Sequence, residues 1–402
     1  MTGNSQISAD LERPGPASAG RPLHVLTLTP FYPSREDAVD GCFVAEPLEA
    51  LAKGVVSTVL ALQPFYRARR HTRETEAGAR WLRYFSLPGA AGLAMAGAFL
   101  FARIVGEVRE LHRRQPIDLI HAHAPLPCGH AAFLLNSELK IPYVVSVHGL
   151  DVFSREGIEG RLGDGRFRIS QKAYSSSRRV ICISELVREQ VLEGMGRTCR
   201  TSVVYNGVDP ELFSPGALLL PDEAPVLSVG NLIPIKGQGV LIRAIAALAG
   251  EFPELVLEII GDGPERGRLE DLAKGLGIAS RVRFHGRQSR NEVVAAMRRC
   301  TVFALPSRYE GLGCVFLEAM STEKPVIGCR GQGIAEIVQH GVNGFLVGPD
   351  NEKELTIALA MLMRDESLRR KLGSAARDTI LDRLTLANQA ESMLRIYREC
   401  AA

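Results

Sequence analysis

Short apolar runs alternate with helical patterns along almost the whole chain, and this alternation limits the possible folds more than any other feature. In the first half the runs cover 23–29, 55–62, 117–123, 143–149, 180–184 and 201–207. In the second half they cover 226–230, 255–263, 282–286, 301–306, 325–328 and 344–347. Short apolar strands that are separated by helices form a parallel sheet with both faces covered. We therefore predict an α/β fold with two doubly wound parallel-sheet domains, whose strand ends face a shared cleft, the expected ligand site.

A proline-rich segment separates the two halves. Residues 206–225 carry four prolines, which break both helix and strand. We expect a linker there, between an N-terminal domain over 21–205 and a C-terminal domain over 226–383. Residues 1–20 are polar and rich in proline, alanine and glycine, so we expect a disordered tail and no signal peptide. The last helical pattern, 384–400, fits either on the second domain or back across the first.

The composition is that of a globular enzyme. Of 402 residues, 46% are hydrophobic and 23% are charged, and the net charge of +3 is too small to indicate nucleic-acid binding. The eight cysteines are scattered, without a CxxC pair or a Cys/His cluster. This pattern favours reduced thiols over disulfides or a zinc site, so we expect a cytoplasmic protein.

The segment 66–85 interleaves six arginines, Arg67, Arg69 and Arg70 among them, with aromatic residues. Such a mixture binds the face of an anionic membrane, but a solvated surface loop has the same composition. The apolar run at 87–102 is too short, and too rich in glycine and alanine, to span a bilayer. We expect a helix packed on the domain there, and leave open a peripheral contact with the inner face of the plasma membrane.

Two glutamates stand out in the segment SRYEGLGCVFLEAMSTEKPVIG, 307–328. Glu310 and Glu318 lie eight positions apart, around a Gly-Leu-Gly turn that leads from an apolar strand into a helical pattern. The N–H groups at such a helix start favour an anion, whereas carboxylates beside them accept hydrogen bonds from sugar hydroxyls. Chance also produces this spacing, but a solvated glutamate is less expected between Leu317 and Ala319. The predicted ligand is anionic and rich in hydroxyls, as a nucleotide sugar is.

A second turn carries a basic residue. Gly230, Lys236 and Gly237 frame the loop between the strand at 226–230 and the next helical pattern. A lysine near a helix start is not favoured by the helix dipole, so a bound anion explains it, although a lone solvated lysine is equally common. Neither GxxxxGK[ST] nor GxGxxG occurs in the chain, which excludes the usual phosphate loop and a dinucleotide-dependent dehydrogenase.

The order of the motifs carries a resemblance. GNLIPIKG, GDGPE, VRFHG, SRYEGLGCVFLEAM and GQGIAEIVQHGVNGFLV follow one another in the second half, after DLIHAHAPLPCGHAA, YVVSVHGLDVF, ICISE and VVYNGVD in the first. This set closely resembles the retaining glycosyltransferases of family 4, the group 1 type, over residues 22–400. The resemblance implies the GT-B fold, in which two Rossmann-like domains face each other.

The resemblance also implies roles for the matching residues. Glu318 is expected to bind the ribose hydroxyls, and Glu310 the transferred sugar. Lys236 is expected to neutralise the diphosphate, and His148, in the HGLD motif, to lie at the domain interface near the donor sugar. The catalytic candidates are therefore His148, Lys236 and Glu310.

Further donor contacts follow from the same motifs. Gly41 is expected to let its loop approach the phosphates or the acceptor, although many members have two glycines there. Asp262 and the turn with Arg287 are expected to line the base pocket. The donor-binding candidates are Gly41, Asn231, Lys236, Asp262, Arg287, Glu310, Leu312, Gly313 and Glu318.

One position departs from the family pattern. Asn231 stands where many relatives carry an arginine on the diphosphate, so Arg308 or Arg330 is expected to compensate, or else the acceptor side differs. The chain has no DxD motif, which suits stabilisation of the leaving group by the protein. We therefore expect no metal site and no cofactor beyond the nucleotide-sugar substrate.

The resemblance implies an enzyme that moves a hexose-type sugar from a UDP- or GDP-linked donor to a glycan or lipid-linked acceptor, as in cell-surface polysaccharide biosynthesis. Two alternatives stay open, a nucleotide-sugar epimerase of the same fold and a non-catalytic donor-binding subunit. The epimerases lack the combination of EGLGCVFLE and KG, and the presence of all the candidate side chains argues against the second. The donor base and the acceptor are not fixed by these motifs.

Overall fold

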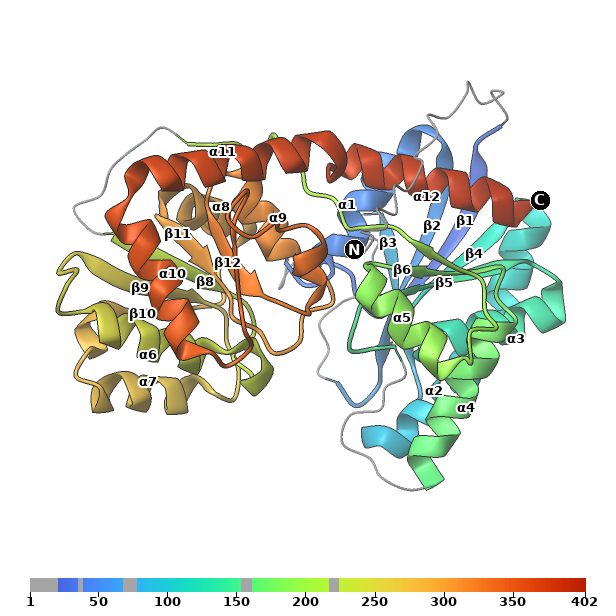
Figure 1. The fold of residues 1–402 in the computed structure, drawn as a ribbon. Coiled ribbons are helices and arrows are strands. Elements are labelled where there is room, and N and C mark those ends of the chain that lie inside the picture. Colours follow the sequence, from blue (N-terminus) through green and yellow to red (C-terminus); the bar gives the residue numbers. More distant parts are fainter. Residues whose placement is uncertain (1–20, 35–38, 68–77, 153–160, 217–223) are drawn as a thin grey trace, which may run out of the picture.

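The computed structural model describes residues 21–34, 39–67, 78–152, 161–216 and 224–402. Two α/β domains lie side by side, and α11 (Glu366–Arg383) and α12 (Leu386–Ala401) run along one side of both (Figure 1). The tail expected over residues 1–20 lies outside the described residues.

The N-terminal domain contains a seven-stranded parallel sheet in the order β3-β2-β1-β4-β5-β6-β7. Its strands are β1 (Leu23–Thr29), β2 (Val55–Pro64), β3 (Ala79–Tyr84), β4 (Leu119–His123), β5 (Tyr143–Val147), β6 (Arg179–Cys182) and β7 (Thr201–Val203). Its helices are α1 (Cys42–Ala50), α2 (Gly89–Arg114), α3 (His130–Leu139), α4 (Arg161–Ser175) and α5 (Glu185–Gly194).

The C-terminal domain contains a six-stranded parallel sheet in the order β10-β9-β8-β11-β12-β13. Its strands are β8 (Ala224–Val229), β9 (Leu255–Ile260), β10 (Val282–Gly286), β11 (Val302–Ala304), β12 (Val326–Cys329) and β13 (Phe345–Val347). Its helices are α6 (Gln238–Leu248), α7 (Arg266–Gly275), α8 (Arg290–Arg299), α9 (Cys314–Ser321), α10 (Glu352–Arg364) and α11.

The predicted doubly wound fold is confirmed. In both sheets the strand order reverses beside the first strand, because the chain first winds to one edge and then returns to the other. Neighbouring residues of β1 point to opposite faces, yet Val25 and Leu26 both have no exposed surface. They belong to different hydrophobic clusters, one on each face of the sheet, which explains why the strands read as continuous apolar runs.

The strand β3 was not predicted. It forms an edge of the N-terminal sheet, within the segment 66–85 that the sequence left as a loop or a membrane-binding face. Ala79, Leu82 and Tyr84 are buried, whereas Arg80 is exposed. An edge strand is only partly covered, so its sequence reads as a mixture of basic and apolar residues. Residues 68–77, with Arg69 and Arg70, lie outside the described part of the chain.

From Gly89 onward, the apolar run at 87–102 forms the first part of helix α2, which packs on the domain as predicted. Leu100, Ile104 and Val108 are at most 1% exposed, and they share one face because they are four residues apart. Within the described residues, no helix is long and apolar enough to cross a membrane.

The last helix, α12, crosses back to the N-terminal domain. Met393 and Tyr397 on this helix are buried in the same hydrophobic cluster as Val44 and Leu48 of α1. The Tyr397 hydroxyl also lies 2.7 Å from Nδ1 of His121 in β4. The sequence left two placements open for 384–400, and the structure has the one in which this helix crosses back over the first domain.

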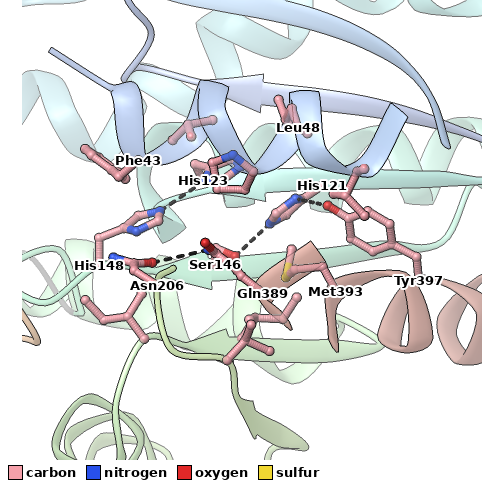
Figure 2. Close-up of a pocket in the computed structure, with 16 residues that line it drawn as sticks. Phe43, Leu48, His121, His123, Ser146, His148, Asn206, Gln389, Met393 and Tyr397 are labelled. Carbon is pink, nitrogen blue, oxygen red and sulfur yellow. Dashed lines mark hydrogen bonds between the residues drawn. The ribbon is translucent and has the colours of Figure 1, made fainter. Parts of the chain in front are cut away.

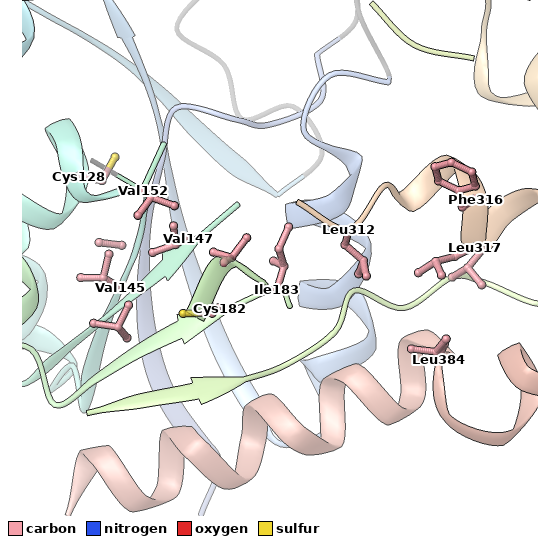
Figure 3. Packing of buried hydrophobic residues seen from close by; sticks show 14 of the residues in the cluster. Cys128, Val145, Val147, Val152, Cys182, Ile183, Leu312, Phe316, Leu317 and Leu384 are labelled. Atoms are coloured by element: carbon pink, nitrogen blue, oxygen red, sulfur yellow. The ribbon is translucent and has the colours of Figure 1, made fainter. Parts of the chain in front are cut away.

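Apolar contacts join the two domains near the centre of the molecule. Figure 3 shows Ile183, just after β6, facing Leu312 of the turn before α9, and both residues belong to one hydrophobic cluster that extends through both domains. Glu336 of the C-terminal domain accepts hydrogen bonds from the backbone N–H groups of Glu185 and Leu186, each at 2.8 Å. A carboxylate at this position also complements the N-terminal end of the α5 dipole.

One buried arginine joins carboxylates of both domains. The guanidinium of Arg290, at the start of α8, donates to Glu318 of α9 and to Glu46 of α1, at 2.8 and 3.0 Å to the two Glu46 oxygens. It also lies 4.6 Å from the centre of the Phe213 ring. The three charged side chains are 17%, 5% and 24% exposed for Arg290, Glu318 and Glu46, so water screens them little.

We expect Arg290→Met to lower the free energy of unfolding by about 3–5 kcal/mol, because removal of one partner leaves buried carboxylates without a counter-charge. Burial, opposed by Arg290, already raises the pKa of Glu46. In Arg290→Met the folded-state pKa of Glu46 lies still further above its unfolded-state pKa. The loss of unfolding free energy therefore grows as the pH rises through the folded-state pKa. Urea unfolding at about pH 5 and about pH 8 measures both effects.

Arg364→Met provides the matched control. Arg364 pairs with Glu251 while the two side chains are 61% and 47% exposed, and exposed pairs contribute about 0–1 kcal/mol. If the two variants unfold at the same urea concentration, the charge cluster around Arg290 does not stabilise the fold.

Candidate functional site

A cavity of about 390 Å³ lies between the two domains. In the C-terminal domain it is bounded by the residues at the carboxyl ends of β8, β9 and β10 and by the first residues of α9, and in the N-terminal domain by the loop before α1. This is the crevice that the reversal of strand order creates in a doubly wound sheet. Its lining includes Gly41, Phe43, Gly230, Asn231, Lys236, Gly261, Arg287, Gln288, Glu310, Gly313, Cys314 and Val315.

A charged pair faces this cavity. Nζ of Lys236 lies 2.6 Å from Oε2 of Glu310, and the two side chains are 18% and 13% exposed. The same Glu310 oxygen is 3.5 Å from the Ser307 hydroxyl. Two residues 74 positions apart in the sequence are therefore brought together at the edge of the cavity, where the lysine charge is available to an anion.

The start of α9 provides backbone donors at the same place. Gly313 caps this helix with φ +83°, and no side chain caps its free N–H groups. Cys314 and Val315, the first two residues of the helix, line the cavity together with Gly313. Leu312 has no exposed surface and does not line the cavity. The positive end of the helix dipole therefore lies beside the Lys236 ammonium group.

Glu318 lies behind the cavity. It is one turn further along α9 and is 3% exposed, and it pairs with Arg290. It is absent from the lining of the cavity. A ligand that hydrogen-bonds to Glu318 must therefore displace or share the Arg290 guanidinium, which Glu46 also holds.

The structure explains why position 41, in the loop before α1, is a glycine. Gly41 lines the cavity and has φ +83°. A Cβ atom at this position would lie 2.3 Å from the backbone nitrogen of Tyr32. Any other residue is therefore excluded by both conformation and space, because the loop folds back against its own backbone at Phe31 and Tyr32.

Three of the predicted contacts lie elsewhere. The carboxylate of Asp262 accepts a hydrogen bond from the backbone N–H of Gly263 at 2.8 Å, and Asp262 does not line the cavity. Arg308 pairs with Asp350 at 2.6 Å and Arg330 pairs with Glu354 at 2.5 Å. Neither arginine lines the cavity, so neither replaces the charge that Asn231 lacks.

His148 faces a second, smaller cavity of about 30 Å³ (Figure 2). Its carbonyl oxygen lies close to Gly311, which places the residue at the domain interface as expected. Its ring does not line the larger cavity. Phe43 lines both cavities, and its ring lies 4.9 Å from that of His148. Burial lowers the pKa of His148 to about 4.

The side chains around His148 were not predicted from the sequence. His121 and His123 of β4 and Tyr397 of α12 line the smaller cavity with it. A signal was present, because two histidines at alternate positions of a strand lie on the same face. Arg290 was also missed, since no spacing in the sequence connects it with Glu46. Among the described residues there is no cluster of three or more side chains able to hold a metal ion.

Two family models together match most of the chain. The model for glycosyltransferase family 4 matches residues 48–212, and the model for glycosyl transferases group 1 matches residues 214–379. The two matched ranges correspond to the two domains.

Three curated relatives are similar over about two thirds of the chain. An uncharacterized glycosyltransferase of Methanocaldococcus jannaschii is 34% identical over 65% of this chain and 70% of its own length. D-inositol 3-phosphate glycosyltransferase of Stackebrandtia nassauensis is 31% identical over 70% and 68%. N-acetyl-alpha-D-glucosaminyl L-malate synthase of Bacillus anthracis is 27% identical over 69% and 74%.

Solved structures share the fold. Sucrose-phosphate synthase from Thermosynechococcus elongatus aligns with a TM-score of 0.77 at 21% identity, over 94% of this chain and 98% of that one. The Anabaena protein HepE in complex with UDP aligns with a TM-score of 0.73 at 21% identity, over 94% and 100%. Together with the two family matches and the relatives, these likenesses show that the chain belongs to glycosyltransferase family 4 and is a glycosyltransferase of the group 1 type with the GT-B fold.

Proposed function

We propose that this enzyme transfers a hexose-type sugar from a UDP- or GDP-linked donor, with retention of configuration, to a glycan or lipid-linked acceptor in cell-surface polysaccharide biosynthesis. The observation that carries the donor proposal is the cavity of about 390 Å³ where Lys236, Glu310 and the start of α9 meet. Its volume suits a small-molecule ligand. HepE, a neighbour in fold, is described in complex with UDP, which supports the uridine donor.

The charges around this cavity suit loss of a nucleoside diphosphate. Negative charge develops on the departing phosphate, and fixed donors nearby stabilise it without reorganisation. Lys236 and the uncapped N–H groups of α9 supply such donors. Glu310, which pairs with Lys236, accepts hydrogen bonds from hydroxyls of the transferred sugar.

Glu318 is the proposed acceptor for the ribose hydroxyls. Its charge is balanced by Arg290, so the donor competes with or joins that pair. Arg290 keeps Glu46 as a partner and does not lose its counter-charge. Ribose binding is thereby linked to a contact between the two domains.

A panel of UDP, GDP and ADP in a thermal-shift assay tests the donor site, because ligand-linked stabilisation rises with occupancy. We expect Glu318→Gln to weaken binding of the stabilising nucleotide by roughly 10- to 150-fold, the loss of one charged hydrogen bond. Glu310→Gln is expected to leave nucleotide affinity nearly unchanged and to slow transfer by a similar factor. Equal effects of both substitutions on nucleotide binding would show that these roles are wrong.

Metal independence is a separate prediction. If Lys236 and the α9 amides stabilise the diphosphate without a metal, an excess of EDTA should leave the initial rate of transfer unchanged. Addition of Mg²⁺ or Mn²⁺ to the EDTA-treated enzyme is the control. Complete loss of turnover that only the metal restores would contradict the proposal.

One observation favours a second class of acceptor, a small anion. Two of the relatives are named for anionic acceptors, inositol 3-phosphate and L-malate. Rates with a phosphorylated polyol and with a lipid-linked glycan decide between the two classes.

A membrane contact is proposed for the lipid-linked case. Five apolar side chains, each 48–54% exposed, gather at the ends of β2 and β3 and the first two turns of α2: Phe65, Tyr66, Phe85, Leu87 and Met95. Arg83 lies 4.9 Å from the centre of the Phe65 ring, and Arg67 is exposed beside it. Apolar groups with flanking arginines suit an anionic membrane surface.

We expect binding to vesicles that contain phosphatidylserine, and expect it to weaken with salt. The triple variant Phe85→Ser, Leu87→Ser, Arg67→Glu should lose this binding, because it removes apolar surface and about 1 kcal/mol for the arginine. Its rate with a water-soluble acceptor should stay unchanged. The control is Val342→Ser, which removes an equally exposed apolar residue from the other domain. Vesicle binding that the triple variant retains would contradict the membrane contact.

A further inference from the structure

Three histidines and a tyrosine form a continuous row behind the domain interface (Figure 2). Nε2 of His148 lies 3.0 Å from Nδ1 of His123, and the two rings are parallel to within 5°. The rings of His123 and His121 are 4.1 Å apart. His121 completes the row, with Nδ1 2.7 Å from the Tyr397 hydroxyl and Nε2 2.7 Å from the Ser146 hydroxyl.

The parallel sheet explains why these side chains meet. His121 and His123 are two residues apart in β4 and therefore share a face. His123 pairs in register with Ser146 of the neighbouring strand β5, and His148 follows Ser146 by two residues, so it continues the same face. Tyr397 closes the row from α12, which covers that side of the sheet.

The ring of His148 is held in one orientation. Phe31 and Phe43 pack edge-on against it, with ring centres at 5.9 and 4.9 Å. Its backbone N–H donates to the carboxylate of Asp151 at 2.8 Å, which fixes the turn after β5. With the ring fixed in place, only the protonation of its two nitrogens can vary. Nε2 bonds to His123, whereas Nδ1 is buried and has no partner among the described residues.

Both imidazoles of this pair are neutral at physiological pH. Burial lowers the pKa of His148 to about 4 and brings the pKa of His123 well below its ordinary value, with His121 and His148 adding to the shift of His123. A neutral imidazole has one N–H and one lone pair. In the bond between them one ring must donate and the other accept, so the state of His123 determines which nitrogen of His148 carries its proton.

We propose that His123 is a positioning residue which, through its hydrogen bond to Nε2, holds His148 in a single tautomer with Nδ1 presented to the transferred sugar. This rests on the proposed function, in which His148 contacts the donor. The Phe43 ring, which lines both cavities, must move aside for that contact. The cavity of about 30 Å³ beside His123 has room for roughly two waters at about 10–15 Å³ each. Such a water would hydrogen-bond to Nε2, the other ring nitrogen of His123.

The geometry supplies two closely matched variants. Asparagine places its amide near the position of a histidine Nδ1, whereas glutamine places it near Nε2. His123→Asn therefore keeps a group able to bond Nε2 of His148, and His123→Gln does not. Both replace a buried histidine by a primary amide, so a general loss of packing affects both.

The tautomer is read directly from the ¹⁵N chemical shifts of the His148 ring nitrogens, assigned by their loss in His148→Asn. We expect one protonated and one unprotonated nitrogen in the wild-type enzyme and in His123→Asn, and an averaged pair of shifts in His123→Gln. We expect kcat to fall roughly 10-fold in His123→Gln and to stay within about threefold in His123→Asn, with the donor KM unchanged in both.

Two results overturn the inference: an unchanged single tautomer in His123→Gln, or the same kcat loss in His123→Gln and His123→Asn. Failure of the proposed function looks different. It would appear in the wild-type enzyme as the absence of turnover with every nucleotide sugar tested, whatever the ring nitrogens show.

Discussion

The charge balance around Arg290 is the constraint on which the relation between the two domains depends. Glu46 and Glu318 come from different domains, and both are largely buried. Two such carboxylates repel each other and lose hydration, so they lie close only because a cation stands between them. An electrostatic contact therefore joins the two domains here, and the apolar packing around Ile183 and Leu312 adds a second contact between them.

The sequence predicted the central strands of both sheets and missed the edge strand β3. β1, β4 and β5 appear as apolar runs because neighbouring residues on opposite faces are all covered. β3 is an edge strand, and its two arginines, Arg80 exposed and Arg83 half-buried, hid it within a basic segment. Periodicity reports how a strand is covered, so a partly solvated edge gives a weaker signal than a central strand.

The residues of the candidate site also fall into a group that the sequence predicted and a group that it missed. Lys236, Glu310, Gly313 and Asn231 belong to loops at neighbouring strand ends, and topology alone brings them to one cavity. The partners of Glu318 and His148 depend instead on tertiary contacts. Arg290 is 244 residues from Glu46, and His121 is 276 from Tyr397. No local pattern contains such pairings, because they depend on the docking of whole domains and on the path of the last helix.

The return of α12 has a consequence for how the chain matures. The N-terminal domain leaves the ribosome first, but the face of its sheet that carries α1 stays incomplete until Met393 and Tyr397 arrive. Domains generally fold as units during synthesis, whereas this one is completed only after the second domain, which precedes α12 in the chain, has been synthesised. The apolar surface of α1 and β4 is therefore exposed throughout translation of the second domain, and the order of synthesis makes the C-terminal helix the final structural element of the N-terminal half.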